Sequence, residues 1–255
     1  NDWIEVTAPV IVKGSVEGGS TLFNLKYFED DAFLSQSAQL YLEAMIFSLG
    51  PVWSITPSFR AEKSRTVRHL TEFLHLEAEA PWISLDDLLK IQEELITFVI
   101  KHIVQNNKVE LEFLKRDISE LEKTSSPFDR ITYEKAIDIL RNREFKIVDK
   151  EILRNIEYGD DLSIESERIL TENSSKPLFV IGYPLKIKPF YVKADASKDG
   201  LGIAADLLAP RGFGEIISGG LREDNLDNLE KRMMLEGLEK RNYDWYLDLR
   251  RYGSV

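Results

Sequence analysis

Apolar and polar residues alternate along two neighbouring segments of the chain. The first alternating segment runs through Val52, Ser54 and Thr56, and the second runs from Leu70 to Leu76. Polar residues crowd positions 62–69 between them. A period of two is typical of a strand with one buried face, so the pattern predicts a hairpin with a polar loop.

Helical spacing dominates much of the remaining chain. Ser84 is a candidate N-cap, with Asp86 and Asp87 in the first turn, and apolar residues then recur at helical spacing to about Gln105. Further helices are predicted over 109–123, 131–141 (capped by Thr132), 228–241 and 243–251, and further strands over 178–183, 189–193 and the segment leading to Glu215. Runs of strands with interspersed helices indicate an α+β domain on an antiparallel sheet.

Composition indicates one soluble domain. The 255 residues are 43% hydrophobic, and nothing in their pattern demands a second core. Neither a membrane span nor a secretory signal is visible, and the absence of cysteine suits a reducing cytoplasm, where we expect the protein. Three histidines without metal-binding spacing argue against zinc. A net charge of −11 gives no general attraction to nucleic acid.

Candidate chemistry gathers in the predicted hairpin. Arg60 and Phe73 fall on facing strands near the loop. A guanidinium offers a planar fork of donors to phosphate oxygens, an aromatic ring can stack on a purine, and Glu62 can accept from an exocyclic amine. The residue types suit a nucleoside triphosphate, whereas composition alone favours a charged loop in solvent.

The segment Pro57–Phe73 resembles motif 2 of class II aminoacyl-tRNA synthetases, in the form found in the subgroup for aspartate, asparagine and lysine. The resemblance implies an antiparallel sheet flanked by helices and ATP-dependent activation of an amino acid. It implies that Arg60 contacts the α-phosphate and that Arg68 or His69 lies near the terminal phosphates. The ATP-binding residues implied in full are Arg60, Glu62, Arg68, His69, Leu70, Phe73 and Glu215.

Two earlier segments resemble the amino-acid pocket of this subgroup. Glu17–Phe23 is similar to its mobile loop, which implies that Glu17 meets the substrate ammonium group. Ala32–Glu43 is similar to its strand-to-helix entry, where Ser37 and Gln39 would line the pocket. Leu42 stands where aspartate-specific enzymes carry a lysine, which argues for a neutral substrate side chain. Glu43 would accept a hydrogen bond from a side-chain amide and repel a carboxylate.

The segment Ala205–Glu223 resembles the asparaginyl form more closely than the aspartyl form. Glu215 and Ser218 lie three residues apart and carry the hard oxygen donors that suit Mg²⁺ between phosphates. By resemblance, Asp206 would hold a metal-bound water. Ser218 and Arg222 would belong to the amino-acid-binding residues, and Arg222 would contact the substrate side chain. The catalytic residues implied are Arg60, His69, Glu215 and Arg222.

Both ends of the chain contribute to the expected organisation. Trp3–Pro9 is similar to the strand of motif 1, whereas Arg250–Val255 stops where the family continues into motif 3. We therefore expect residues 1–255 to be a single catalytic domain truncated at both ends, with a helical insertion at about 107–176. The resemblance implies a homodimer, and tRNA binding through an N-terminal domain missing here.

The resemblance leaves three functions open. The leading one is activation of asparagine with ATP and Mg²⁺ to asparaginyl-adenylate, followed by transfer to tRNA(Asn). The second is an archaeal-type asparagine synthetase that makes asparagine from aspartate through the same kind of adenylate. The third is a non-catalytic paralogue, which fold resemblance cannot exclude.

Overall fold

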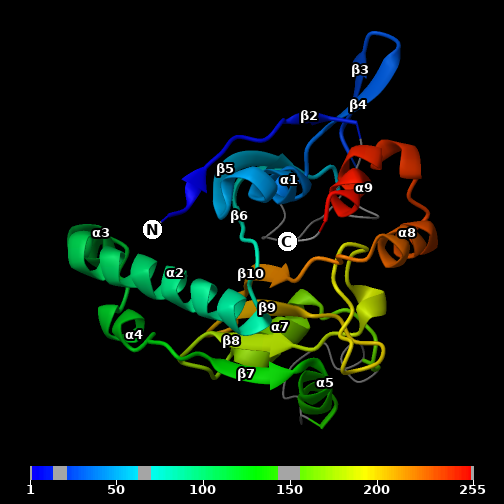
Figure 1. Cartoon of the computed structure of the whole chain (residues 1–255). Coiled ribbons are helices and arrows are strands. Elements are labelled where there is room, and N and C mark those ends of the chain that lie inside the picture. Colours follow the sequence, from blue (N-terminus) through cyan, green and yellow to red (C-terminus); the bar gives the residue numbers. More distant parts are fainter. Residues whose placement is uncertain (1, 14–21, 63–69, 143–155, 254–255) are drawn as a thin grey trace. The chain divides into compact units, whose positions relative to one another are not determined.

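The computed structural model describes residues 2–13, 22–62, 70–142 and 156–253. Contacts divide the chain into two units, each with its own sheet structure and core (Figure 1). The first unit comprises residues 1–83, 189–191 and 223–255, and the second comprises 84–188 and 192–222.

The predicted hairpin is present in the first unit. Strands β5 (Val52–Phe59) and β6 (Glu72–Glu79) pair antiparallel along their whole length, from Val52↔Glu79 to Phe59↔Glu72. Strand β1 (Ile4–Glu5) adds to β5 in parallel. A second, antiparallel sheet has the order β2 (Ile11–Val12), β4 (Asp30–Leu34) and β3 (Asn24–Tyr27).

Helix α1 (Gln39–Leu49) supplies the core of the first unit. Leu42 and Ile46 on one side of the helix pack with Ala8, Ala38 and Val52. The unit closes with α8 (Leu226–Leu235), a 3-10 turn (η2, Lys240–Asn242) and α9 (Asp244–Arg251). The predicted single helix over 228–241 thus ends earlier, at Leu235, and Gly237 (φ 70°) follows in the left-handed region that commonly ends helices.

The second unit is built on a four-stranded sheet. Its order is β10 (Gly214–Gly220), β9 (Ala204–Ala209), β8 (Leu178–Ile181) and β7 (Asp129–Thr132). The pairs β10–β9 and β9–β8 are antiparallel, and β7–β8 is parallel. The antiparallel sheet architecture is therefore confirmed, with a parallel strand at one edge.

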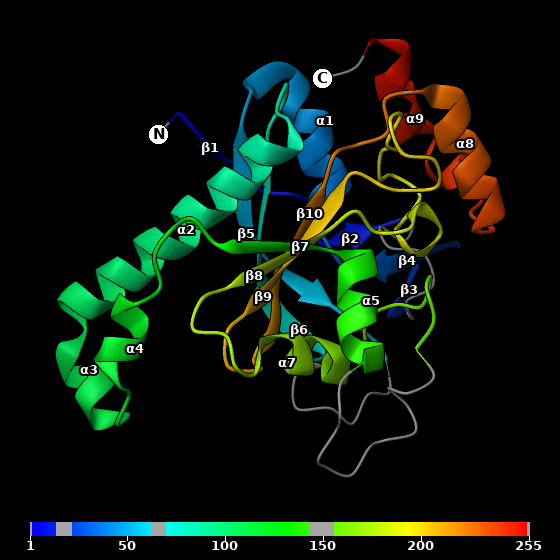
Figure 2. The ribbon, with the colours of Figure 1, turned by 90° about the horizontal axis from the view of Figure 1, so that it is seen from below.

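Helices cover both faces of this sheet. Phe179 and Leu207 pack against Leu89 of α2 (Leu85–Asn106), whereas their neighbours Val180 and Leu208 join a cluster on α5 (Tyr133–Asn142). Helix α7 (Ile164–Thr171) contributes to the α5 side, and Figure 2 shows the sheet with these helices from below. Successive residues of a strand point to opposite faces, so helices packed on both faces of the sheet explain the fully buried β9.

Some predicted element boundaries are observed in the structure, and others differ from it. Helix α2 begins with the predicted cap, where the hydroxyl of Ser84 accepts from the backbone N–H of Asp87. Thr132 caps α5 as predicted, but Ile131 belongs to β7. The predicted helix over 109–123 is two short helices, α3 (Lys108–Phe113) and α4 (Ile118–Glu122). The predicted strand over 189–193 is wrong: only an isolated bridge at Val192 forms there, after the 3-10 turn η1 (Leu185–Ile187).

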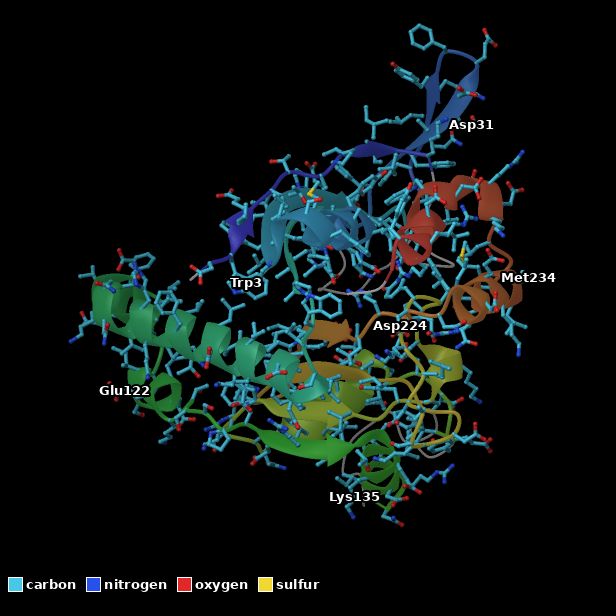
Figure 3. All side chains as sticks on the ribbon, viewed as in Figure 1. Trp3, Asp31, Glu122, Lys135, Asp224 and Met234 are labelled. Atoms are coloured by element: carbon cyan, nitrogen blue, oxygen red, sulfur yellow. The ribbon has the colours of Figure 1, made fainter. Side chains whose placement is uncertain are left out.

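Charged side chains cover the outside of both units. Figure 3 shows Asp31, Glu122 and Lys135 projecting from their ribbons into solvent. In the described part of the chain, no helix is both long and apolar to the degree that crossing a membrane requires.

Candidate functional site

Arg60 and Phe73 meet at the open end of the hairpin in the first unit. The backbone N–H of Arg60 donates to the carbonyl of Thr71 (2.9 Å), which continues the strand pairing by one residue. The guanidinium carbon then lies 5.4 Å from the centre of the Phe73 ring. A cation over an aromatic face is favourable, so the ring holds the guanidinium near the loop.

The other predicted binding residues of the hairpin lie at the ends of its loop or within the loop. Glu62 and Leu70 are exposed at the two ends of the loop. Glu17, Arg68 and His69, predicted to contact substrate ammonium or phosphates, lie outside the described residues.

Helix α1 begins at a carboxylate supplied by β6. One oxygen of Glu77 accepts from the backbone N–H of Ala38 (2.8 Å), and the other accepts from the hydroxyl of Ser37. A carboxylate at a helix N-terminus satisfies orphan donors and complements the helix dipole. Ser37, predicted to line the substrate pocket, is buried and helps to fix this helix start.

Gln39 has an unpartnered donor. Its side-chain Nε2 is buried, and no hydrogen-bond acceptor reaches it from the described residues. A buried amide N–H without a partner is costly, which makes this atom a candidate for a bound ligand. That Gln39 lines the amino-acid pocket stays a prediction.

Glu43 lies one helical turn after Gln39 and is bound by two residues of α9. Tyr246 donates its hydroxyl to Oε2 (2.7 Å), and the Nη2 atom of Arg250 lies 2.6 Å from Oε1. The carboxylate and guanidinium are 3% and 4% exposed, so this is a buried ion pair. Burial opposes the charge of Arg250, but Tyr246 and Glu43 together raise its pKa. Each carboxylate oxygen has a second lone pair, which allows Glu43 to accept a further hydrogen bond. Acceptance from a substrate amide stays a prediction.

Leu42 is fully buried in the core of the first unit. The position predicted to distinguish this pocket from an aspartate pocket therefore holds an apolar side chain, packed with Ala38 and Ile46. The described geometry offers no cation there.

In the second unit, Asp206 is a buried carboxylate with three partners. Its Oδ2 pairs with the ammonium of Lys188 (2.7 Å), and its Oδ1 accepts from the hydroxyl of Ser218 (2.6 Å). Tyr183 also hydrogen-bonds to it, and the Lys188 ammonium lies 3.7 Å from the centre of the Tyr183 ring. If Asp206 holds a metal-bound water as predicted, that water must displace one of these partners or share a carboxylate oxygen with it.

Glu215 lies on the same face of β10–β9, and its backbone N–H donates to Glu167 (2.9 Å). Desolvation, followed by the nearby carboxylates Asp206 and Glu167, raises the pKa of Glu215 to about 8. Lys188 acts in the opposite direction without outweighing them. The residue is nevertheless reached by solvent, so a soluble cation can approach it.

Glu215 and Ser218 fit a magnesium ion that completes its ligands elsewhere. Among the described residues, no group of three or more His, Cys, Asp or Glu side chains could hold a metal ion by itself. Mg²⁺ is usually bound by one or two carboxylates together with waters and substrate phosphates. One carboxylate crowded by other acids, beside one hydroxyl, agrees with that kind of site.

Arg222 follows the two glycines at the end of β10. Its Nη1 donates to the carbonyl of Gly220 (2.9 Å), and its backbone forms a bridge with Val192. Glu43 and Arg222 were predicted to contact the same substrate side chain. Glu43 belongs to the first unit and Arg222 to the second, so this shared contact stays a prediction.

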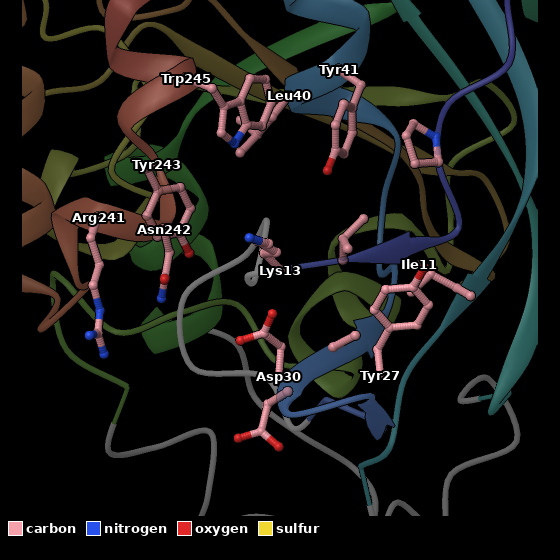
Figure 4. A pocket seen from close by; sticks show the side chains of 14 residues that line it. Ile11, Lys13, Tyr27, Asp30, Leu40, Tyr41, Arg241, Asn242, Tyr243 and Trp245 are labelled. Atoms are coloured by element: carbon pink, nitrogen blue, oxygen red, sulfur yellow. The ribbon is translucent and has the colours of Figure 1, made fainter.

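A cavity of about 710 Å³ lies elsewhere in the first unit. Tyr41 and Trp245 stack at 4.8 Å on one of its walls, and Figure 4 shows Lys13 and Asp30 across from them. Among the predicted site residues that the structure describes, none lines this cavity.

Sequence reasoning missed Tyr246 and Arg250. Both lie in a segment predicted only as an amphipathic helix. One signal was available, since Arg250 falls four residues after Tyr246 on the apolar face of that helix. A charge on a buried face requires a partner, although the sequence does not say which residue supplies it.

The chain resembles asparagine–tRNA ligases over nearly its whole length. It is 53% identical over 253 residues to the enzyme of Pyrococcus horikoshii, covering 99% of this chain and 56% of that protein. It is also 53% identical over 254 residues to the enzyme of Thermococcus kodakarensis, covering 99% and 57%. The chain thus spans little more than half the length of these relatives.

Solved structures agree with the sequence matches. The asparaginyl-tRNA synthetase of Pyrococcus horikoshii complexed with asparaginyl-adenylate matches with a TM-score of 0.92 at 53% identity, covering 100% of this chain and 56% of that one. The asparaginyl-tRNA synthetase of Entamoeba histolytica matches with a TM-score of 0.88 at 40% identity, covering 100% and 56%. Residues 1–255 match the family described as tRNA synthetases class II (D, K and N), and the chain belongs to that family.

Proposed function

We propose that this chain is part of an asparagine–tRNA ligase, which activates asparagine with ATP and transfers it to tRNA(Asn). The observation that carries the proposal is the 53% identity to such a ligase over 99% of the chain. The similar structure with bound asparaginyl-adenylate supports the same intermediate here.

Activation needs position and positive charge more than a base. The carboxylate of asparagine attacks the α-phosphorus of ATP, and pyrophosphate leaves. The nucleophile is already ionised at neutral pH, so no side chain must remove a proton from it. Arg60 supplies a fixed charge for the α-phosphate, and Phe73 both holds Arg60 and offers a face to the adenine.

Selection of the amino acid falls to α1. Gln39 supplies the buried donor, and Glu43 the acceptor for the side-chain amide. In the second unit, Glu215 and Ser218 would hold Mg²⁺, which screens phosphate charge when bound. Arg222 is proposed to contact the substrate side chain, and Arg68 and His69 the terminal phosphates.

A second copy of the chain is the proposed protein partner. Ile4 in β1, within the motif 1 segment, is 43% exposed, and Ile11 in β2, two residues after that segment, is 58% exposed. Apolar side chains left in solvent at a strand are typical of an interface. Light scattering at high micromolar concentration should give a dimer mass; a monomer mass would contradict this part of the proposal.

Exchange of labelled pyrophosphate into ATP, measured on the complete gene product that contains this chain, tests the activity. Exchange that depends on asparagine, together with charging of tRNA(Asn), supports the ligase. Exchange driven by aspartate, with asparagine formed when ammonium is added, would instead identify a synthetase. Silence with both amino acids would indicate a non-catalytic paralogue.

A further inference from the structure

The ion pair of Glu43 and Arg250 changes the electrostatics expected for the amino-acid pocket. Seen in the sequence alone, Glu43 is a lone negative charge that repels an aspartate side chain. In the structure, Arg250 lies 2.6 Å from it, and both groups are almost completely buried. The pair is close to neutral as a whole, so its repulsion of a carboxylate is weaker than that of an isolated glutamate.

Arg250 also has unused donor capacity. Its Nε donates to the carbonyl of Glu223 (3.0 Å), and its Nη2 reaches both Tyr246 and Glu43. Its Nη1 is buried and meets no acceptor among the described residues. The guanidinium lies over the Tyr246 ring at 4.4 Å, which fixes its plane and leaves the fork of donors in place.

We propose that Glu43 masks Arg250, and that the pocket rejects a carboxylate because Arg250 is already neutralised by Glu43. A neutral amide needs only one acceptor and one donor, which the masked pair can provide. A carboxylate needs a cation, and Arg250 is a cation that Glu43 binds directly within the first unit. The inference rests on the proposed function, and it makes Arg250 a latent binding group for aspartate.

Removing the charge of Glu43 should shift the substrate preference from asparagine toward aspartate. Replacing Glu43 by glutamine keeps the shape of the side chain and removes its charge, so Arg250 becomes an unpaired buried cation. A substrate carboxylate can then replace the lost partner. Leu42 cannot supply this charge, because it is an apolar residue of the core.

The test measures kcat/KM for amino-acid-dependent pyrophosphate exchange with asparagine and with aspartate, on the complete gene product. Glu43→Gln should raise the aspartate-to-asparagine ratio by about 10- to 100-fold, the range of one charge-assisted hydrogen bond. Adding Arg250→Gln to that variant should return the ratio to near its original value. Arg251→Gln is the matched control, because Arg251 is exposed and bonded to Asp248 on the same helix.

The exchange measurements separate a failure of the proposed function from a failure of the masking inference. A wild type without asparagine-dependent exchange defeats the proposed function, whereas an active wild type whose ratio is unchanged by Glu43→Gln overturns only the masking inference. A ratio that stays high in the double variant overturns it too, because Arg250 is then not the cation. Should Glu43→Gln fail to fold, Glu43→Asp retains the buried charge but draws it back from Arg250. A rise in its ratio supports masking, and an unchanged ratio contradicts it.

Discussion

Arg60 takes part in two interactions that can be separated experimentally. Its stacking on Phe73 belongs to the protein alone, and a cation–π contact of this partly exposed kind contributes about 0.5–1 kcal/mol. The proposed contact with the α-phosphate is a charge-assisted hydrogen bond, for which about 1.5–3 kcal/mol is usual. Ligand affinity should therefore respond more strongly than stability to substitution of Arg60.

We predict that Arg60→Ala weakens binding of a non-hydrolysable ATP analogue by about 1.5–3 kcal/mol, measured by calorimetric titration. Arg60→Lys keeps the charge but loses the fork, so it should fall between the wild type and Arg60→Ala. Urea unfolding of the same variants controls for stability. Equal affinity in wild type and Arg60→Ala would refute the phosphate contact.

Glu215 makes the stability of the free protein depend on pH. Its pKa is raised from the usual 4.5 to about 8 in the folded chain, so the folded state holds a proton that the unfolded state has lost between these values. The contribution of Glu215 to the free energy of unfolding should be fully present below about pH 4.5 and should be lost as the pH rises toward 8. Thermal melts without divalent cations should show this slope, and Glu215→Gln should flatten it. An unchanged slope in the variant would show that other groups cause it.

The sequence predicts contacts between residues that belong to one local pattern, but it does not predict contacts between residues far apart in the chain. Arg60 and Phe73 were predictable as neighbours, because hairpin register places nearby residues opposite each other. The bond between Tyr246 and Glu43 joins residues 203 positions apart, and periodicity carries no information on such a pair. Lys188, the counter-ion of Asp206, was missed for a related reason, since it lies in an irregular segment after η1.

At the scale of elements, predictions succeeded where the segment itself contains the residues that begin and stabilise the element. Helix α2 has a capping box and a sustained apolar face, and its predicted start is the observed one. The segment 189–193 has the aromatic and β-branched residues of a strand, but its ring-bearing residues Phe190 and Tyr191 are buried by packing instead. Tertiary packing thus overrides strand propensity there, which no local pattern indicates.

The end of β10 depends on two glycines with different surroundings. A Cβ added to Gly220 would lie 2.8 Å from the backbone carbonyl of Ile203, whereas one added to Gly219 would meet the side chains of Gln92 (3.1 Å) and Leu88 (3.4 Å). Side chains can shift by a few tenths of an ångström, but a strand backbone within a paired sheet cannot do so cheaply.

We therefore predict that Gly220→Ala destabilises the chain by about 1–3 kcal/mol in denaturant unfolding, the usual cost of overpacking. Gly219→Ala should cost less, because a flexible glutamine can yield. Gly237→Ala provides a comparison in which φ, rather than space, is the problem: it has φ 70° and no atom within 4 Å of the added Cβ. If Gly219→Ala proved the more harmful of the first two, the assigned contacts would be wrong.

At the scale of the whole chain, net charge limits what it can bind. The 255 residues carry 44 acidic and 33 basic side chains. Binding to tRNA is driven largely by neutralisation of phosphates with release of counterions, and a surplus of acidic groups opposes this attraction. A ligase must nevertheless recognise tRNA. The proposed function therefore requires a surface that binds phosphates or bases outside these 255 residues, or a local basic patch whose attraction outweighs the surplus of acidic side chains.

We predict that the isolated 255-residue chain binds tRNA weakly, with a Kd toward the weak end of the roughly 10⁻⁴–10⁻⁶ M range of non-specific complexes. Fluorescence anisotropy with labelled tRNA(Asn), at about 50 and 200 mM salt, measures both the affinity and its salt dependence. Few phosphate contacts should give a shallow slope, and a non-cognate tRNA should bind as well as the cognate one. The complete gene product is the matched control, and it should bind more tightly and prefer tRNA(Asn). Submicromolar, cognate-selective binding by the 255 residues alone would show that these residues contain the main tRNA-recognition surface, against the expectation from charge.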